Sequence, residues 1–327
     1  MNIDNMNNDG IVLLSKRENE TSFSSLYNVK KAIKTNKVGH TGTLDSFASG
    51  LLVVCVGKMT KLVSNITEFS KEYEAIIKFG EETDTLELTG KIIKTTDLPT
   101  EEKFKSVLLK YKGKMLQLPP QYSAIHINGN RASDLARKGI DSVIPKREIN
   151  VFDSSIKELK LNSNNKVEYA RIFFSVSKGT YIRSLARDIG LDCDSSAHLV
   201  GLRRYSVGNF RIEDAVGYSL LKEFTIENML NNTNCDNLRE SDLNIQAEIK
   251  EKIMNFNKNI SLECNFENLI ISDEYVDDFK NGKKILHKWF NEISETDKTY
   301  SIFTSMEMFI GLIEYKNNTF TYKFVIN

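Results

Sequence analysis

The first third of the chain alternates between apolar patterns typical of strands and one typical of a helix. Residues 11–14 form a short apolar run suited to a buried strand, and Phe23, Leu26, Tyr27 and Ile33 then recur at helical spacing. Residues 51–56 form a second apolar run rich in β-branched side chains. The pattern predicts a buried strand, a helix and another buried strand.

The next segments combine an alternating strand with an amphipathic helix. Apolar and charged residues alternate from Glu72 to Phe79, which is the period of a half-buried strand and places Tyr73 on the inner side. Apolar residues at positions 104, 107, 108 and 111 predict an amphipathic helix. It is expected to begin after Thr100, whose side chain can cap it, and to end near Gly113.

Periodicity weakens over residues 119–145 and returns beyond them. The weak region suggests an arm outside the sheet that carries a short helix over residues 132–138. A long strand is predicted over 167–176 and a helix over about 180–189, on which Arg183 and Arg187 lie one turn apart. Beyond an Asn-rich connector, residues 300–326 are β-rich. Together these patterns indicate an α+β main domain followed by a small, mainly β, C-terminal domain.

Charge divides the 327 residues in a similar way. The whole chain is neutral, with 44 Lys and Arg against 44 Asp and Glu, but residues 1–220 hold 32 basic against 26 acidic residues. That part is therefore net +6, and the remainder, with 12 against 18, is net −6. Basic residues alternate with aromatic ones between Arg131 and Arg211, a composition that suits RNA but also suits an ordinary solvated face.

Cysteine spacing and hydropathy exclude several classes of protein. The 4 cysteines are far apart and form no C-x-x-C pair, so neither disulfides nor a zinc site is expected. No apolar run approaches the ~20 residues that span a bilayer. The acidic start, residues 1–10, lacks the features of a signal peptide. A cytoplasmic protein without a metal site is expected.

Chemistry concentrates in one segment of twelve residues, GHTGTLDSFASG over positions 39–50. Its glycines could cradle a phosphate, although the spacing matches no known phosphate-binding loop. A tight loop could instead hold Asp45 for nucleophilic or acid–base work, or Asp45 could simply cap the following segment. The residues alone leave these interpretations open.

The longer segment over positions 39–61, GHTGTLDSFASGLLVVCVGKMTK, resembles the catalytic signature of bacterial tRNA pseudouridine-55 synthases of the TruB type. Further matches follow in the family's order: Lys71-Glu72-Tyr73 with Gly80, Thr83-Asp84-Thr85, Tyr122-Ser123-Ala124, the segment from Ser177 to Arg183, and Leu202-Arg203-Arg204. The resemblance covers residues 10–215. It implies a mixed or antiparallel central sheet flanked by helices, the pseudouridine synthase fold.

The resemblance also implies the reaction. A uridine in the T loop of tRNA, at position 55, would be isomerised without a cofactor or metal: the C1′–N1 bond breaks, the base rotates, and C1′ bonds to C5. The family's catalytic Asp falls on Asp45, and the Arg that pairs with it falls on Arg183. Tyr73 matches the Tyr that stacks on the target base and takes the C5 proton, although a core Tyr would fit the strand pattern equally well.

Six further residues are expected to bind substrate. His40 matches the His that enters the T loop, although a simple loop hydrogen bond would also explain it, and Leu202 matches an apolar contact to the flipped base. Arg203 and Arg204 are expected to meet phosphates. The resemblance adds Lys16 and Tyr181 to this set, so that the predicted binding residues are His40, Tyr181, Leu202, Arg203, Arg204 and Lys16.

The match has local departures. The family's Lys-Pro-x-Gly-x-Thr-Ser appears as the segment from Lys16 to Ser22, in which Arg17 replaces Pro and Asn19 replaces Gly. Asn is the non-Gly residue that best tolerates a left-handed backbone, so the turn can survive. Glu87 stands where Asp is usual. These departures bear on stability and local fit more than on the chemistry.

The predicted organisation is a catalytic domain over 1–225 with an RNA-gripping arm at 119–145, a connector over 226–265, and a PUA-like RNA-binding domain over 266–327. The expected partner is the T stem-loop of tRNA, with no membrane and no obligate protein partner. Two rival functions are a noncatalytic tRNA-binding or folding protein and a guide-RNA-dependent synthase. Intact Asp45, Tyr73 and Arg183 weigh against the first, and the arm weighs against the second.

Overall fold

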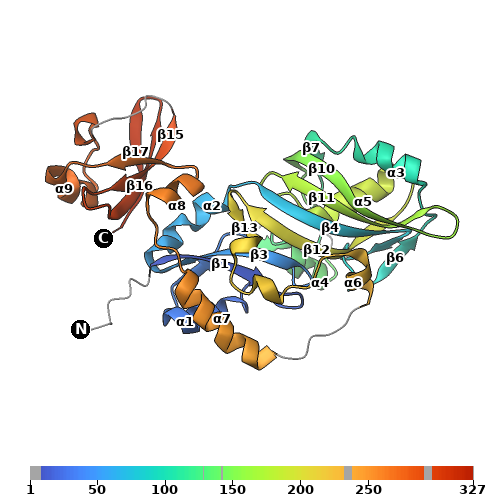
Figure 1. Cartoon of the computed structure of the whole chain (residues 1–327). Helices are drawn as coiled ribbons and strands as arrows, with labels where there is room; N and C mark the ends of the chain where they lie inside the picture. Colours follow the sequence, from blue (N-terminus) through green and yellow to red (C-terminus); the bar gives the residue numbers. More distant parts are fainter. Residues whose placement is uncertain (1–8, 128, 141–142, 232–237, 291–296, 327) are drawn as a thin grey trace.

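We describe a computed structural model of the whole chain, shown in Figure 1. It describes all residues except 1–8, 128, 141–142, 232–237, 291–296 and 327. A large sheet with helices and a smaller β-rich domain lie side by side in the view.

The large sheet follows the order β1-β3-β12-β4-β11-β10-β7, with β2 paired to β3 and β13 paired to β12. Only β3 and β12 run parallel; the other pairs in this sheet are antiparallel. This arrangement confirms the predicted mixed, largely antiparallel sheet. The bounds are β1 (Gly10–Lys16), β2 (Val38–His40), β3 (Ser49–Val56), β4 (Lys71–Phe79), β7 (Gly113–Gln117), β10 (Arg147–Leu161), β11 (Val167–Val176), β12 (Ala197–Val207) and β13 (Phe210–Arg211).

Two helices cover the central strands and complete the main core. They are α3 (Glu101–Leu108), capped by Thr100 as predicted, and α5 (Ile182–Asp192). Their apolar side chains join those of β4, β11 and β12 in one cluster. Tyr73 belongs to this cluster, so it lies on the inner side of β4 as the alternation predicted.

A second pair of helices covers β1 and β3 at the other end of the sheet. Helices α1 (Leu26–Ile33) and α7 (Leu238–Lys252) lie side by side across these strands (Figure 1). Of the four apolar residues that recur at helical spacing, Phe23 and Tyr27 do not join the core, since their side chains are 71% and 55% exposed. The reason is rotational: Leu26, Val29 and Ile33 form the buried stripe, and Tyr27 lies one residue off it.

Smaller elements emerge from the main domain. The arm holds the hairpin β8 (His126–Ile127) and β9 (Asn130–Arg131) and then α4 (Ala132–Arg137), which confirms the predicted short helix. A second hairpin joins β5 (Glu81–Thr83) to β6 (Ile92–Thr95). The remaining elements here are 3-10 helices η1 (Gly57–Leu62), η2 (Ile212–Asp214) and η3 (Tyr218–Leu220), and helices α2 (Val63–Thr67) and α6 (Ile226–Leu230).

The C-terminal part contains a four-stranded sheet in the order β14-β15-β16-β17. Its elements are α8 (Lys258–Glu263), β14 (Glu267–Ile270), η4 (Asp273–Tyr275), α9 (Val276–Lys280), η5 (His287–Trp289), β15 (Lys298–Phe303), β16 (Phe309–Lys316) and β17 (Thr319–Val325). Phe266, Phe303 and Leu312 from this part share one apolar cluster with Ile11 and Leu51 of the large sheet. A continuous core therefore joins the small, mainly β, domain to the main domain.

Within the described residues, no helix is both long enough and apolar enough to cross a membrane. Cys55, Cys193 and Cys264 are free thiols, and all three are buried.

Candidate active site

The chemically dense segment is a loop between β2 and β3. His40 pairs with Val54 at its start, and the fully buried strand β3 begins at Ser49. Ser22 fixes the backbone beside Asp45, because its hydroxyl accepts a hydrogen bond from the Leu44 N–H at 2.8 Å and donates one to the Leu44 carbonyl at 3.1 Å. A turn closes on the other side, where the Ala48 N–H donates to the Asp45 carbonyl at 3.1 Å. Hydrogen bonds thus hold the loop backbone on both sides of Asp45.

Arg183, in the first turn of α5, contacts both carboxylate oxygens of Asp45. Its Nη2 donates to Oδ1 at 3.2 Å, and its Nε lies 3.0 Å from Oδ2 as an ion pair outside hydrogen-bonding angles. The Arg183 side chain is only 6% exposed, whereas that of Asp45 is 36% exposed. The guanidinium therefore forms the buried half of the pair, and the carboxylate is the half that solvent or a substrate can reach.

The other contacts of Arg183 join three further segments. Its Nη1 donates to the Thr85 carbonyl at 3.0 Å, and its Nη2 donates to the Tyr122 carbonyl at 2.9 Å. The Glu87 carboxylate lies 3.8 Å from Nη1. A planar group with five N–H donors suits such a junction, because it can bond to carbonyls and a carboxylate at once.

Glu87 belongs to the site, although no role there was expected for it from the residues. Burial raises the pKa of Glu87 above its ordinary value; Arg183 opposes this effect, and the charge of Asp45 adds to it. The sequence signal was its place just after the Thr83-Asp84-Thr85 match, where an acidic residue is usual. The structure shows the reason for that position, since the carboxylate faces the same guanidinium as Asp45.

Tyr73 lies on the inner face of the sheet and is almost fully buried. It shares the main apolar cluster with Leu44 and Phe47, which flank Asp45 in the loop. Leu202, on the neighbouring strand β12, belongs to the same cluster and is 5% exposed. The loop that carries Asp45 is therefore packed, through Leu44 and Phe47, into the same apolar cluster as Tyr73 and Leu202.

Tyr181 directly precedes helix α5, which carries Arg183. Tyr181 is half-buried just before α5, where the Arg147 guanidinium lies 5.5 Å from its ring centre. Its backbone is held by Gln117, which donates to the Tyr181 carbonyl at 3.0 Å and accepts from its N–H at 2.8 Å. Gln117 was not among the predicted site residues, because no pattern marks a single buried amide on a strand.

Burial lowers the pKa of His40, and the nearby charge of Arg204 lowers it further. The neutral imidazole is therefore favoured. Its Nδ1 accepts a 3.4 Å hydrogen bond from the Gly42 N–H, which is the simple loop contact considered from the sequence. The same side chain is half-buried and so keeps part of its surface open.

The predicted phosphate contacts of Arg203 and Arg204 were wrong. The two residues are 5% and 1% exposed, and their guanidinium groups bond to the protein itself. Arg204 donates to the carbonyls of Leu51 and Gly42 at 2.7 Å and 3.0 Å. Arg203 donates to the Ser49 hydroxyl and the Lys222 carbonyl at 3.1 Å and 2.7 Å. Both tie strand β12 to its surroundings because a buried guanidinium must find acceptors.

Lys16 also differs from its predicted role as a substrate contact. It is 0% exposed, and its ammonium donates to the carbonyls of Ser46 and Ala48 at 3.1 Å and 2.5 Å. Both carbonyls belong to the loop between β2 and β3, residues 41–48, which we call the catalytic loop. Burial lowers its pKa to about 8, against the opposing charges of Glu20 and Asp45. Lys16 therefore holds the loop through buried hydrogen bonds and does not face the solvent.

Comparisons with known proteins agree with this geometry. A family model described as TruB family pseudouridylate synthase (N terminal domain) matches residues 30–182. The tRNA pseudouridine synthase B of Treponema denticola is 37% identical over 98% of this chain and 99% of its own length. The chain belongs to the TruB family of pseudouridylate synthases. Another relative, the tRNA pseudouridine synthase B of Clostridium acetobutylicum, is 35% identical over 93% of this chain and 94% of its own length.

Solved structures share the fold of this TruB family member. A chain in the crystal structure of a Cbf5-Nop10-Gar1 complex matches with a TM-score of 0.64 and 22% identity, covering 97% of this chain and 84% of that one. A chain in an H/ACA RNP bound to a substrate RNA containing 2'-deoxyuridine matches with a TM-score of 0.60 and 20% identity, over 96% and 82%. The α+β pseudouridine synthase fold, with a small C-terminal domain, is thus confirmed.

In this pseudouridylate synthase, the site offers a reachable carboxylate and a buried guanidinium. Among the residues that the structure describes, no three His, Cys, Asp or Glu side chains are grouped as metal ligands are. The groups present suit nucleophilic or acid–base catalysis on a base and its ribose.

Proposed function

We propose that the chain isomerises uridine to pseudouridine at position 55 in the T loop of tRNA, as a single chain without a guide RNA. The observation that carries this proposal is the pair of Asp45 and Arg183, in which only the carboxylate reaches the surface. The names of its full-length relatives, tRNA pseudouridine synthase B, support tRNA as the substrate.

In the proposed reaction the carboxylate of Asp45 assists cleavage of the C1′–N1 bond, and Arg183 holds it in place. The detached uracil rotates beside Tyr73 and Leu202, which are assigned to contact the base, and C1′ bonds to C5. The C5 proton then leaves, and N1 gains a proton, so the product is an isomer of the substrate. The hydroxyl of Tyr73 is assigned to the removal of the C5 proton, and His40 and Tyr181 are assigned to the RNA around the flipped nucleotide.

The direct test uses an unmodified transcript of tRNA and the purified full-length protein. Pseudouridine mapped at nucleotide resolution should appear at position 55, and a transcript with cytidine there should gain none. Binding without modification would favour a noncatalytic tRNA-binding protein. Modification only after a guide RNA is added would favour the guide-dependent alternative.

We expect Tyr73→Phe to separate chemistry from binding. Because the ring is retained and base stacking is worth ~1 to 3 kcal/mol, tRNA affinity should change little. Loss of a positioned acid–base group should lower the single-turnover rate by about 10² to 10⁴. Tritium release from tRNA labelled at C5 of uridine measures the step, and a binding titration at the same salt concentration is the control. A normal rate of release would remove Tyr73 from proton transfer.

Arg204→Met is expected to act on stability. The carbonyls of Leu51 and Gly42 would lose a charged donor in the interior, which should cost about 2 to 4 kcal/mol of unfolding free energy. Calorimetry should show a lower Tm, while the dependence of tRNA affinity on salt should keep its slope, because no phosphate contact is lost. A shallower slope with an unchanged Tm would restore the phosphate-binding role.

A further inference from the structure

Residues 16–22 form a support around the catalytic loop. The ammonium of Lys16 bonds to the carbonyls of Ser46 and Ala48, and the Asn19 N–H donates to the Ser46 carbonyl at 2.8 Å. Ser22 bonds to both backbone groups of Leu44. These contacts lie on both sides of Asp45 in the sequence, so the position of the catalytic loop depends on the position of this support.

The support contains a tight turn closed by an ion pair. Asn19 has a φ of 64°, in the left-handed region, so the turn carries a backbone conformation that needs fixing by its surroundings. Arg17 provides this by bonding to Glu20 through Nε at 2.9 Å and Nη2 at 2.7 Å. The second oxygen of Glu20 accepts a 3.2 Å hydrogen bond from the Ser25 hydroxyl, which links the turn to the start of α1.

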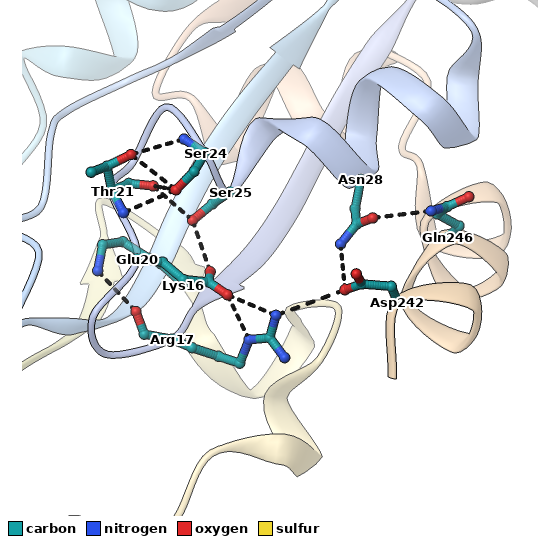
Figure 2. Close-up of polar contacts among 9 residues, drawn as sticks. All are labelled: Lys16, Arg17, Glu20, Thr21, Ser24, Ser25, Asn28, Asp242 and Gln246. Atoms are coloured by element: carbon teal, nitrogen blue, oxygen red, sulfur yellow. Dashed lines mark hydrogen bonds and ion pairs between the residues drawn. The ribbon is translucent and has the colours of Figure 1, made fainter. Parts of the chain in front are cut away.

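Helix α7 contacts this turn through Asp242, which faces Arg17 (Figure 2). The Asp242 carboxylate lies 3.8 Å from Nη2 of Arg17, and the same oxygen accepts a 3.0 Å hydrogen bond from Asn28 of α1. Gln246, one turn further along α7, donates to the Asn28 side-chain oxygen at 3.0 Å. Asp242 therefore joins the turn and α1 to one point on α7.

The charged side chains of this arrangement are less exposed to solvent than those of an ordinary surface ion pair. The side chains of Arg17, Glu20 and Asp242 are 24%, 28% and 38% exposed. They are therefore partly shielded from the solvent that weakens ordinary surface pairs. Arg17 also has two carboxylates around it, and α7 is anchored along the same face as Asp242 by the buried Ile245 and Ile249. A buried helix face gives the polar contacts a fixed base.

We propose that Arg17, Glu20 and Asp242 are positioning residues for catalysis. They brace residues 16–22 against α7 and so keep the catalytic loop, with Asp45, in register with Arg183. The inference rests on the proposed function, and it assigns to α7 a role in the chemical step. Soon after α7 the chain pairs Met254 with Ile11 of β1 and enters the C-terminal domain, so the brace also connects that domain's linker to the active site.

The experiment measures chemistry and binding separately. Asp242→Ala, Arg17→Met and the double variant are compared with the wild type by single-turnover tritium release from tRNA labelled at C5 of uridine, with the protein in excess. Filter binding gives the Kd, and calorimetry gives the Tm. Glu251→Ala is the matched control, because it removes an exposed carboxylate nine residues along the same helix, on its opposite side.

We expect each single variant to lower the single-turnover rate about 10-fold, because a small displacement of a reacting group has a large effect on rate. The Kd should stay within about twofold, since none of the three side chains lies on the proposed RNA site. The double variant should resemble the slower single variant, because both substitutions break the same connection. Glu251→Ala should behave as the wild type does.

Three results would overturn the proposal. The first is single-variant rates within about twofold of the wild type, and the second is a rise in Kd that accounts for the lower rate. The third is a double variant about 100-fold slower than the wild type, which would indicate independent effects.

If Asp242→Ala is unfolded at the assay temperature, Asp242→Asn decides, because its amide can still accept from Asn28 while the charge toward Arg17 is lost. A wild type that releases no tritium and forms no pseudouridine would refute the proposed function itself.

Discussion

Asp45→Asn should abolish pseudouridine formation while leaving the fold and the affinity for tRNA intact. The amide has the shape of the carboxylate and can keep one contact to Arg183, so the loop contacts made by Ser22 and Lys16 should persist. It lacks the negative charge that nucleophilic or base catalysis needs. We expect the single-turnover rate to fall by about 10⁴ or more, as when the central group of a catalytic set is removed.

The measurement combines single-turnover tritium release with a binding titration and a thermal melt of the same preparation. Asp214→Asn is a matched control, because it makes the same chemical change at an exposed position outside the site. Clear residual turnover by Asp45→Asn, with the control fully active, would contradict the assignment of Asp45. Loss of folding in the variant would show as a lower Tm and would be separated from loss of chemistry in that way.

Much of the fold follows from the period of the apolar residues. The strand from Lys71 to Phe79 and the helix after Thr100 were predicted because each repeats one simple pattern, and local chemistry fixes the cap. The first helix shows where such reasoning fails. Phe23 and Tyr27 fit a helical period, but which stripe is buried depends on what packs against the helix, and here that includes α7, more than 200 residues away in the sequence.

The sites of positive charge were harder to predict than the catalytic carboxylate. Asp45 stands in a dense motif, so the sequence marks it as a candidate, and the family resemblance then assigns it the catalytic role. Arg203 and Arg204 look like phosphate ligands in a sequence, because basic residues are usually exposed. They lie instead on a central strand whose neighbours on both sides exclude solvent, and most of their acceptors are backbone carbonyls, which no side-chain pattern reveals.

The pairing of Asp45 with Arg183 illustrates the same limit. The two residues are 138 positions apart, and only the family resemblance linked them before the structure did. The structure adds what the resemblance could not supply, namely that Arg183 also holds the carbonyls of Thr85 and Tyr122 and faces Glu87. Such contacts depend on tertiary folding and leave no periodic signal.

Those contacts explain why Arg183→Lys should be severely defective. An ammonium is a single point with three donors, whereas the guanidinium reaches Asp45, Thr85 and Tyr122 from opposite ends of a plane. A lysine could keep at most part of this set, and the carboxylate of Asp45 would lose its two-atom contact. We expect the single-turnover rate to fall by about 10² to 10⁴, the size of effect seen when an electrostatic partner is misplaced.

The matched control for Arg183→Lys is Arg187→Lys, one turn further along α5, where the guanidinium bonds to Asp188 and to the Leu118 carbonyl. Both variants keep the charge of the helix, so any general effect on RNA attraction should be shared. If Arg183 acts by orienting Asp45, only Arg183→Lys should lose rate, and its Kd for tRNA should stay near that of the wild type. A near-normal rate with weakened binding would instead make Arg183 an RNA contact, and equal losses in both variants would indicate that α5 had merely been destabilised.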